Sequence, residues 1–179
     1  MSATKIFISG GPGGGKTTLS RRLAAKLNVS LYELDGFFLR GIAGGEPFEV
    51  VSNKVVAEIT ARDTWIAEGA YLGWVEPLLI EADLIVWLDV PWRVASYRIV
   101  SRHVRATVAR KNRFPGWRRM YRFWRWSRRY YRNSNPPGLN SWSVPGNRAT
   151  AVEYLSTYKL KMVTCRTRED VEQVLAQSF

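Results

Sequence analysis

Cysteine and histidine are scarce in this sequence, which contains one of each among its 179 residues. A single cysteine excludes a disulfide framework and a cysteine-rich metal site, and it favours a reducing compartment. A single histidine excludes a metal site built from several histidines and disfavours a Ser–His–Asp triad. Apolar stretches are also short, and none approaches the roughly 18 residues of a transmembrane helix. Because a strand-like run begins near the N-terminus and leaves no room for a signal peptide, we expect a cytoplasmic protein.

Acidic side chains are missing from one long segment. The chain carries 27 Lys and Arg against 15 Asp and Glu, which gives a formal net charge of +12. Of these basic residues, 15 lie between positions 91 and 150, where there is no Asp or Glu, so the rest of the chain is slightly acidic. Such a segment needs an anionic partner, for example a polyphosphate, a nucleic acid or a membrane surface.

The hydrophobic pattern predicts one α/β domain. Strand patterns at 5–9, 30–34, 64–67, 84–90 and 159–165 alternate with helical patterns at 17–27, 47–59, 93–110, 116–132 and 149–157. Thr167 is expected to cap a last helix, with Asp170 completing a capping box. The alternation predicts a doubly wound, five-stranded parallel sheet with an Arg/Trp-rich helical lid insertion. We assign residues 1–179 to a single domain and residues 103–147 to a basic lid and linker region.

The segment after the first predicted strand matches the phosphate-binding pattern G-x-x-x-x-G-K-S/T and leads into a helix pattern. Backbone N–H groups in such a loop, together with the N-terminus of its helix, bind phosphate. We expect Lys16 to reach the β- and γ-phosphates and the Thr17 hydroxyl to ligate Mg²⁺. The predicted ATP-binding residues of this segment are Gly10, Gly11, Pro12, Gly13, Gly14, Gly15, Lys16, Thr17 and Thr18.

Three further segments resemble parts of adenylate kinases. Residues 90–102 (VPWRVASYRIVSR) resemble the point where a Val-Pro leads into a helix with two lid-flanking arginines. This resemblance implies that Arg98 and Arg102 neutralise phosphate charge during transfer. Residues 65–69 (WIAEG) resemble the third strand of that family, which places Glu68 at the acidic position that supports Mg²⁺. Arg40 follows the second predicted strand, where the family places an arginine on the acceptor's phosphate.

The chain is most similar to the shorter adenylate-kinase-like proteins known as DNA topology modulation proteins. The shared features are Leu-Asp at 34–35, an acidic-Gly pair after the third strand and an Arg-rich segment with interleaved Trp and Tyr. The chain departs from adenylate kinases at Ala70 and Tyr71, where they carry Phe-Pro-Arg, and at 104–132, which replaces their compact lid. The resemblance implies a P-loop, nucleotide-kinase-like phosphotransferase, and the departures favour an acceptor other than AMP.

Three other charged residues lie at predicted strand ends. Asp35 is expected to accept the acceptor's hydroxyl proton or to hold Mg²⁺ through water, and the alternative is an ordinary turn aspartate beside Gly36. Arg166 follows the last strand, where this fold places the adenine ring, and is a candidate for stacking on the base. For Asp89 we expect a local role at the start of the helix that Pro91 opens.

The segment 114–132 combines arginines with aromatic residues at helical spacing. Trp117, Tyr121 and Trp124 lie on one side, next to a stripe that consists of Arg118, Arg122, Arg125 and Arg129. Three hypotheses follow: a lid whose arginines close over nucleotide phosphates, a nucleic-acid-binding arm, or an amphipathic helix on an anionic membrane. The lid hypothesis leads, because the segment begins where the lid of the resembling family begins.

The leading functional hypothesis is an ATP-dependent kinase that transfers a γ-phosphoryl group to a small acceptor. ATP and Mg²⁺ would be its ligands, with Asp35 and Arg40 on the acceptor side. The alternative is an ATP-binding regulatory protein whose basic segment binds nucleic acid.

Overall fold

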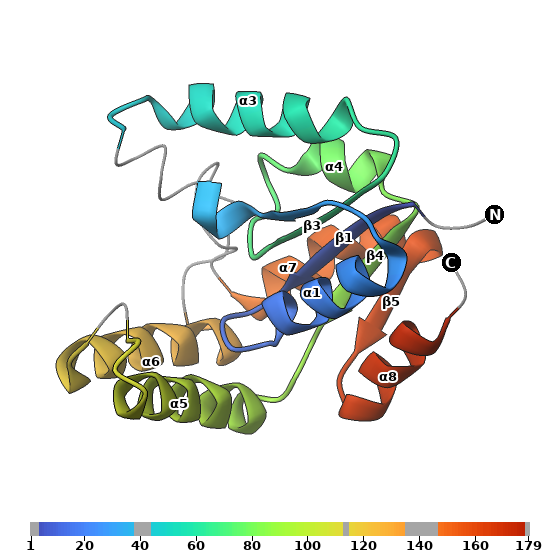
Figure 1. The fold of residues 1–179 in the computed structure, drawn as a ribbon. Helices are drawn as coiled ribbons and strands as arrows, with labels where there is room; N and C mark the ends of the chain where they lie inside the picture. The colour runs from blue at the N-terminus through green and yellow to red at the C-terminus, as the bar shows by residue number, and fades with distance from the viewer. Residues whose placement is uncertain (1–3, 38–43, 113–114, 135–146, 178–179) are drawn as a thin grey trace.

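A computed structural model describes residues 4–37, 44–112, 115–134 and 147–177 (Figure 1). Five strands form one sheet: β1 (Lys5–Gly10), β2 (Leu31–Glu33), β3 (Trp65–Gly69), β4 (Leu84–Leu88) and β5 (Met162–Cys165). All neighbouring pairs are parallel, and the strand order is β2-β3-β1-β4-β5. The prediction of a doubly wound, five-stranded parallel sheet is confirmed. In such a sheet the carboxyl ends of the strands share one edge, which is where ligands bind.

Helices cover both faces of the sheet. The first face carries α1 (Lys16–Leu27) and α8 (Arg168–Ala176), whose Leu19, Leu23 and Val174 pack on apolar residues of β1, β3, β4 and β5. The opposite face carries α3 (Phe48–Thr60), α4 (Glu76–Glu81) and α7 (Arg148–Leu155), packed on Phe7 and Trp65. The strands read as nearly continuous apolar runs because both of their faces are buried.

Two long helices extend beyond the carboxyl edge of the sheet as a hairpin of α5 (Trp92–Val108) and α6 (Trp117–Tyr131) (Figure 1). The Trp124 indole donates to the Ser96 hydroxyl at 2.7 Å, and the rings of Trp92 and Trp124 lie 5.4 Å apart. These contacts hold α6 along α5. The hairpin is the helical insertion that the sequence predicts.

Three local features differ from the sequence prediction. Strand β2 stops at Glu33, and 34–37 forms a helical turn that buries Leu34, so Asp35 lies in this turn and not at the strand end. Helix α4 was not predicted, because it has only six residues and buries only Leu78 and Leu79. Strand β5 begins at Met162, later than predicted, because a 3₁₀ segment (Ser156–Lys161) precedes it.

The helix caps follow the sequence signals. Thr167 and Asp170 form the predicted capping box at the start of α8, and the Asn147 side chain accepts from the Thr150 amide at the start of α7. Within the predicted lid and linker region of residues 103–147, positions 113–114 and 135–146 lie outside the described residues. Within the described ranges, no helix combines the length and apolar character that crossing a membrane requires.

Candidate active site

The phosphate loop joins β1 to α1 and turns tightly at the carboxyl edge of the sheet. The Gly14 amide donates to the Gly11 carbonyl at 3.1 Å, which closes the turn. Gly13 has a φ of 76°, and a Cβ there would lie 2.8 Å from the Ala95 carbonyl oxygen. Glycine is therefore required at Gly13 both for its conformation and for the close approach of α5.

Lys16 lies across this loop. Its Nζ donates to the carbonyls of Gly10 at 2.9 Å and Gly11 at 3.4 Å. Burial lowers the pKa of Lys16, while the carboxylates of Glu68 and Asp35 act in the opposite direction. The ammonium group is thus preorganised at the loop, near the carboxylate of Glu68 on β3 and that of Asp35 in the turn after β2.

The Thr17 hydroxyl donates to Oε1 of Glu68 at 2.7 Å. Glu68 is 2% exposed, and its second oxygen, Oε2, is buried with no hydrogen-bond partner among the described residues. Burial raises the pKa of Glu68, and the nearby Lys16 charge opposes this shift. Hydroxyl and carboxylate oxygens are the ligands that Mg²⁺ prefers, so Thr17 and the unpaired oxygen of Glu68 fit this cation.

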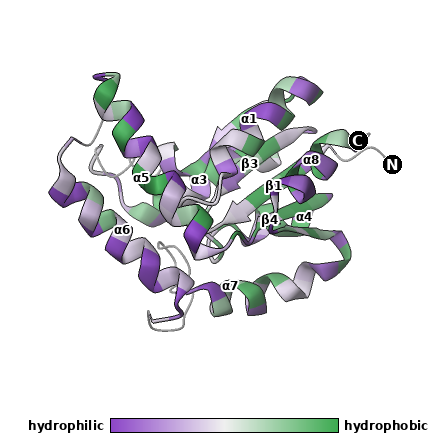
Figure 2. Ribbon diagram, turned by 90° about the horizontal axis from the view of Figure 1, so that it is seen from below, coloured by the Kyte–Doolittle hydropathy of each residue, from purple (hydrophilic) through white to green (hydrophobic). Residues whose placement is uncertain are grey.

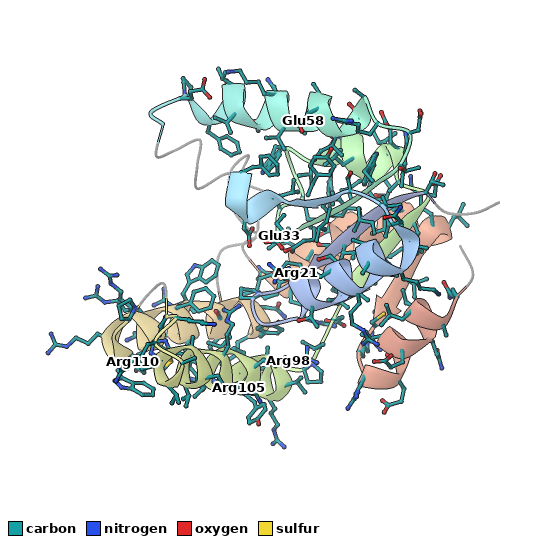
Figure 3. The ribbon with its side chains drawn as sticks, viewed as in Figure 1. Arg21, Glu33, Glu58, Arg98, Arg105 and Arg110 are labelled. Atoms are coloured by element: carbon teal, nitrogen blue, oxygen red, sulfur yellow. The ribbon has the colours of Figure 1, made fainter. Side chains whose placement is uncertain are left out.

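Arg98 and Arg102 follow one face of α5. The Arg98 guanidinium donates to the Gly14 carbonyl, which brings its charge to the phosphate loop. Arg102 is exposed, and its charge contributes to lowering the pKa of Lys16, so it lies within electrostatic range of that amine. Figure 3 shows Arg98 on the part of α5 near α1, with Arg105 and Arg110 farther along the hairpin.

Asp35 is exposed, and its carboxylate lies within electrostatic range of Lys16. Burial, together with the negative charge of Asp35, raises the pKa of Tyr71, so the Tyr71 hydroxyl lies close to this carboxylate. Sequence reasoning missed Tyr71, since nothing in the local pattern connects it to a residue 36 positions away. Arg40, the other predicted acceptor residue, lies outside the described residues.

The expectation for Asp89 was wrong. The Asp89 side chain is buried and accepts hydrogen bonds from Nε and Nη2 of Arg148 and, at 3.3 Å, from Nε of Arg166. The carboxylate thus pairs with two cations that are distant in sequence. One of them, Arg148, belongs to the segment between positions 91 and 150, which contains no Asp or Glu. Arg166 lies at the edge of a cavity of about 340 Å³, lined also by Trp92, Tyr131 and Arg148.

The end of α6 lies directly on the phosphate loop. The Tyr131 hydroxyl donates to the Pro12 carbonyl at 3.0 Å, and a Cβ at Gly11 would lie 2.5 Å from the Tyr130 ring. By contrast, the arginine stripe of α6 (Arg118, Arg122, Arg125 and Arg129) is exposed. The tyrosines and the stripe occupy different sides of the helix, so the stripe does not face the loop.

No protein-family profile matches the chain. A segment of 114 residues is 31% identical to the cytidylate kinase of Sulfolobus acidocaldarius, and the match covers 55% of this chain and 61% of that protein. Shikimate kinase from Acinetobacter baumannii, solved with shikimate, has a TM-score of 0.52 and 15% identity over 97% of this chain and 91% of its own. A gluconokinase from Sinorhizobium meliloti has a TM-score of 0.44 and 17% identity, over 56% of this chain and 65% of its own.

The sheet order and the likeness to shikimate kinase over nearly the whole chain show the P-loop kinase fold. The cytidylate kinase match supports the resemblance to P-loop nucleotide-kinase-like proteins that the sequence motifs indicate.

Proposed function

We propose that this protein is an adenylate-kinase-like phosphotransferase that transfers the γ-phosphoryl group of ATP to a hydroxyl of a small acceptor. The observation that carries the proposal is the arrangement around Lys16. Its amine is fixed on the loop carbonyls, with the Thr17–Glu68 pair and the Asp35 carboxylate nearby. The phosphates of the donor, the divalent cation and the general base for the acceptor are thereby assigned to different residues around the Lys16 amine.

On the donor side, the loop amides and Lys16 hold the triphosphate, and Arg98 and Arg102 offset the charge that spreads over the γ-phosphoryl oxygens. The cavity beside Arg166 has the size of a small-molecule site. Its Trp92 and Tyr131 rings and the Arg166 guanidinium offer flat surfaces for the adenine ring.

Thr17 and Glu68 would hold Mg²⁺, which neutralises charge on the β- and γ-phosphates when it is bound. The remaining steps belong to the chain's own residues. Asp35 accepts the proton of the acceptor hydroxyl as that oxygen bonds to the γ-phosphorus. The bond from the γ-phosphorus to the bridging oxygen breaks, ADP leaves with the electron pair, and the products are ADP and the phosphorylated acceptor. The Tyr71 hydroxyl lies close to the Asp35 carboxylate and would orient it.

The proposal is tested by incubating the protein with ATP, Mg²⁺ and a panel of hydroxyl-bearing metabolites while ADP release is followed. We expect release that depends on one acceptor class, with the phosphorylated product visible by mass spectrometry. Tight ATP binding without acceptor-dependent ADP release would contradict the kinase assignment and favour a regulatory protein.

The exposed arginine stripe supports a second candidate function, nucleic-acid binding by an ATP-binding regulator. The stripe lies at the centre of the solvent-facing side of α6, while Trp117, Tyr121 and Trp126, which are 40–58% exposed, lie toward its edges. Hydrophilic positions recur along this helix in Figure 2. A helix that inserts into a membrane has the opposite order, with apolar residues at the centre. In a nucleic acid bound to α6, the phosphates would lie on the arginine stripe and the bases would stack on the aromatic rings at its edges.

Salt titrations of nucleic-acid binding test this second candidate. A variant with Arg122, Arg125 and Arg129 changed to Gln should reduce the slope of log K against log salt by about 2. The control removes three exposed charges outside α6, at Arg62, Lys159 and Arg168, and should leave the slope unchanged. Equal slopes for the stripe variant and the control would contradict a nucleic-acid site on α6.

A further inference from the structure

The outer side of α5 exposes a row of apolar side chains to solvent. They belong to Val94, Tyr97, Val104 and Val108, which are between 38% and 80% exposed. Spacings of three, seven and four residues return to the same side of a helix, so the row forms one stripe about 21 Å long. We call it the α5 stripe. The helix lies at the lower edge of the molecule in Figure 1, and hydrophobic positions recur along it in Figure 2.

The opposite side of α5 is occupied by the rest of the protein. Ala95 and Ile99 are buried, and a Cβ at Gly13 of the phosphate loop would meet them at 2.8 and 3.0 Å. Toward α6, the Trp92 ring and the Ser96 hydroxyl contact the indole of the neighbouring helix. The α5 stripe faces away from both sets of contacts, so the packing of the described fold does not account for it.

Arginines flank the α5 stripe on both sides. Arg93 comes four residues before Tyr97 and Arg105 three residues before Val108, so each is a neighbour of the stripe. Both are exposed, and a turn of about 100° per residue places them at opposite margins. No Asp or Glu occurs between positions 91 and 150, so no carboxylate of α5 or α6 offsets their charges. An apolar centre with cationic margins is the order of a helix that lies on an anionic bilayer, and α6 lacks this order.

We propose that the α5 stripe docks on a bilayer surface that contains anionic lipids. The valines and Tyr97 enter the boundary between headgroups and acyl chains, where a tyrosine ring is favoured. Arg93 and Arg105 contact lipid phosphates at the two margins. The proposal goes beyond the phosphotransferase function and does not depend on it.

Other occupants fit the α5 stripe less well. In a second copy of this chain, the arginines at the margins would meet like charges. A partner helix would need an apolar side chain at every turn of the seam, but Ser101 interrupts the stripe between Tyr97 and Val104. A bilayer surface has no register, so a single serine in the row is tolerated there.

Co-sedimentation of the full chain with lipid vesicles tests the proposal. One set of vesicles consists of phosphatidylcholine alone, and the other contains roughly three parts in ten of phosphatidylserine. We expect the protein to sediment with the anionic vesicles and to stay in solution with the neutral ones. Absence of binding to the anionic vesicles, or equal binding to both sets, overturns the proposal.

A matched pair of double variants separates the α5 stripe from the general positive charge. Val94→Ser with Val104→Ser should lower the partition coefficient at least about fivefold, because two apolar side chains no longer enter the interface. Val50→Ser with Val152→Ser, on α3 and α7, is the control and should leave it unchanged. All four valines are 37–42% exposed, so the two variants alter comparable surface. Wild-type binding by the stripe variant, or the same loss in the control, overturns the proposal.

A fluorophore at single positions shows which helix meets the bilayer. Tyr97→Cys on α5 and Arg122→Cys on α6 each carry a polarity-sensitive label, and the native Cys165 is buried. With anionic vesicles, we expect a blue shift for the label at 97 and the emission of an aqueous label at 122. A blue shift at 122 alone places α6 on the bilayer and overturns the proposal.

Sedimentation equilibrium without lipid tests the second-copy alternative. We expect the protein to show no self-association that depends on the α5 stripe. A dimer that the Val94→Ser, Val104→Ser variant abolishes, together with no vesicle binding by the wild type, assigns the stripe to contact between copies and overturns the proposal.

Discussion

The Thr17 hydroxyl donates to the Glu68 carboxylate at 2.7 Å, across 51 positions of sequence. This bond joins the start of α1 to the end of β3 and leaves the second oxygen of Glu68 buried without a hydrogen-bond partner among the described residues. In Glu68→Gln, the amide oxygen still accepts from Thr17, but the negative charge is lost. We expect kcat to fall at least about tenfold, in line with the loss of one charge-assisted contact of about 1.5–3 kcal/mol. The Mg²⁺ concentration for half-maximal activity should rise in the same assay, whereas Glu58→Gln on α3 should leave both quantities unchanged.

The same substitution should stabilise the protein without nucleotide. Burial raises the pKa of Glu68 in the folded state, so the folded protein binds this proton more tightly than the unfolded chain does. The ionised carboxyl therefore costs stability above its folded-state pKa, and the cost disappears as the pH falls below the ordinary glutamate value. Melting curves should give Glu68→Gln the higher Tm at pH 7, with a difference that narrows toward pH 4. A Tm difference that does not change with pH would contradict this account.

The pair of Asp89 and Arg148 should contribute more to stability than the pair of Asp89 and Arg166. The Asp89 side chain is 3% exposed, against 34% for Arg148 and 66% for Arg166. Arg148→Ala leaves a buried carboxylate without its bidentate partner, and we expect a loss of about 3 kcal/mol in urea unfolding. Arg166→Ala removes a largely solvent-screened partner and should cost less than about 1 kcal/mol. Equal losses would show that Arg148 is not the principal partner.

Nucleotide binding should be visible in tryptophan fluorescence. The rings of Trp92 and Tyr131 lie 5.4 Å apart, and the Tyr131 hydroxyl bonds to Pro12 of the phosphate loop. Phosphates that enter the loop should shift this contact and change the emission of Trp92 and Trp124. Tyr131→Phe keeps the ring but loses the bond, so it should show a smaller change at saturating Mg-ATP. An identical change in both proteins would mean that the tyrosine does not connect the loop to the hairpin.

Features set by short stretches of sequence could be predicted, and features set by distant partners could not. The strand–loop–helix context of residues 10–17 and the Thr167 capping box are local, and both are present in the fold. The turn that contains Asp35 was missed because Leu34 continues the apolar pattern of β2, although it is buried against Gly69. The roles of Asp89 and Tyr71 depend on Arg148 and Asp35, far along the chain, and no local pattern indicates such pairs.

The most direct test of the central claim is transfer of the γ-phosphoryl group, measured as ADP release with acceptor present, in the wild type and in Lys16→Ala. The substitution removes an ammonium that the loop carbonyls hold in place, at little expected change in Tm. We predict acceptor-dependent ADP release by the wild type and a loss of about 10- to 100-fold in Lys16→Ala, the range expected for a charge-assisted contact to phosphate. Equal rates of ADP release in the two proteins, both still folded, would contradict the claim that this loop binds the phosphates of the donor.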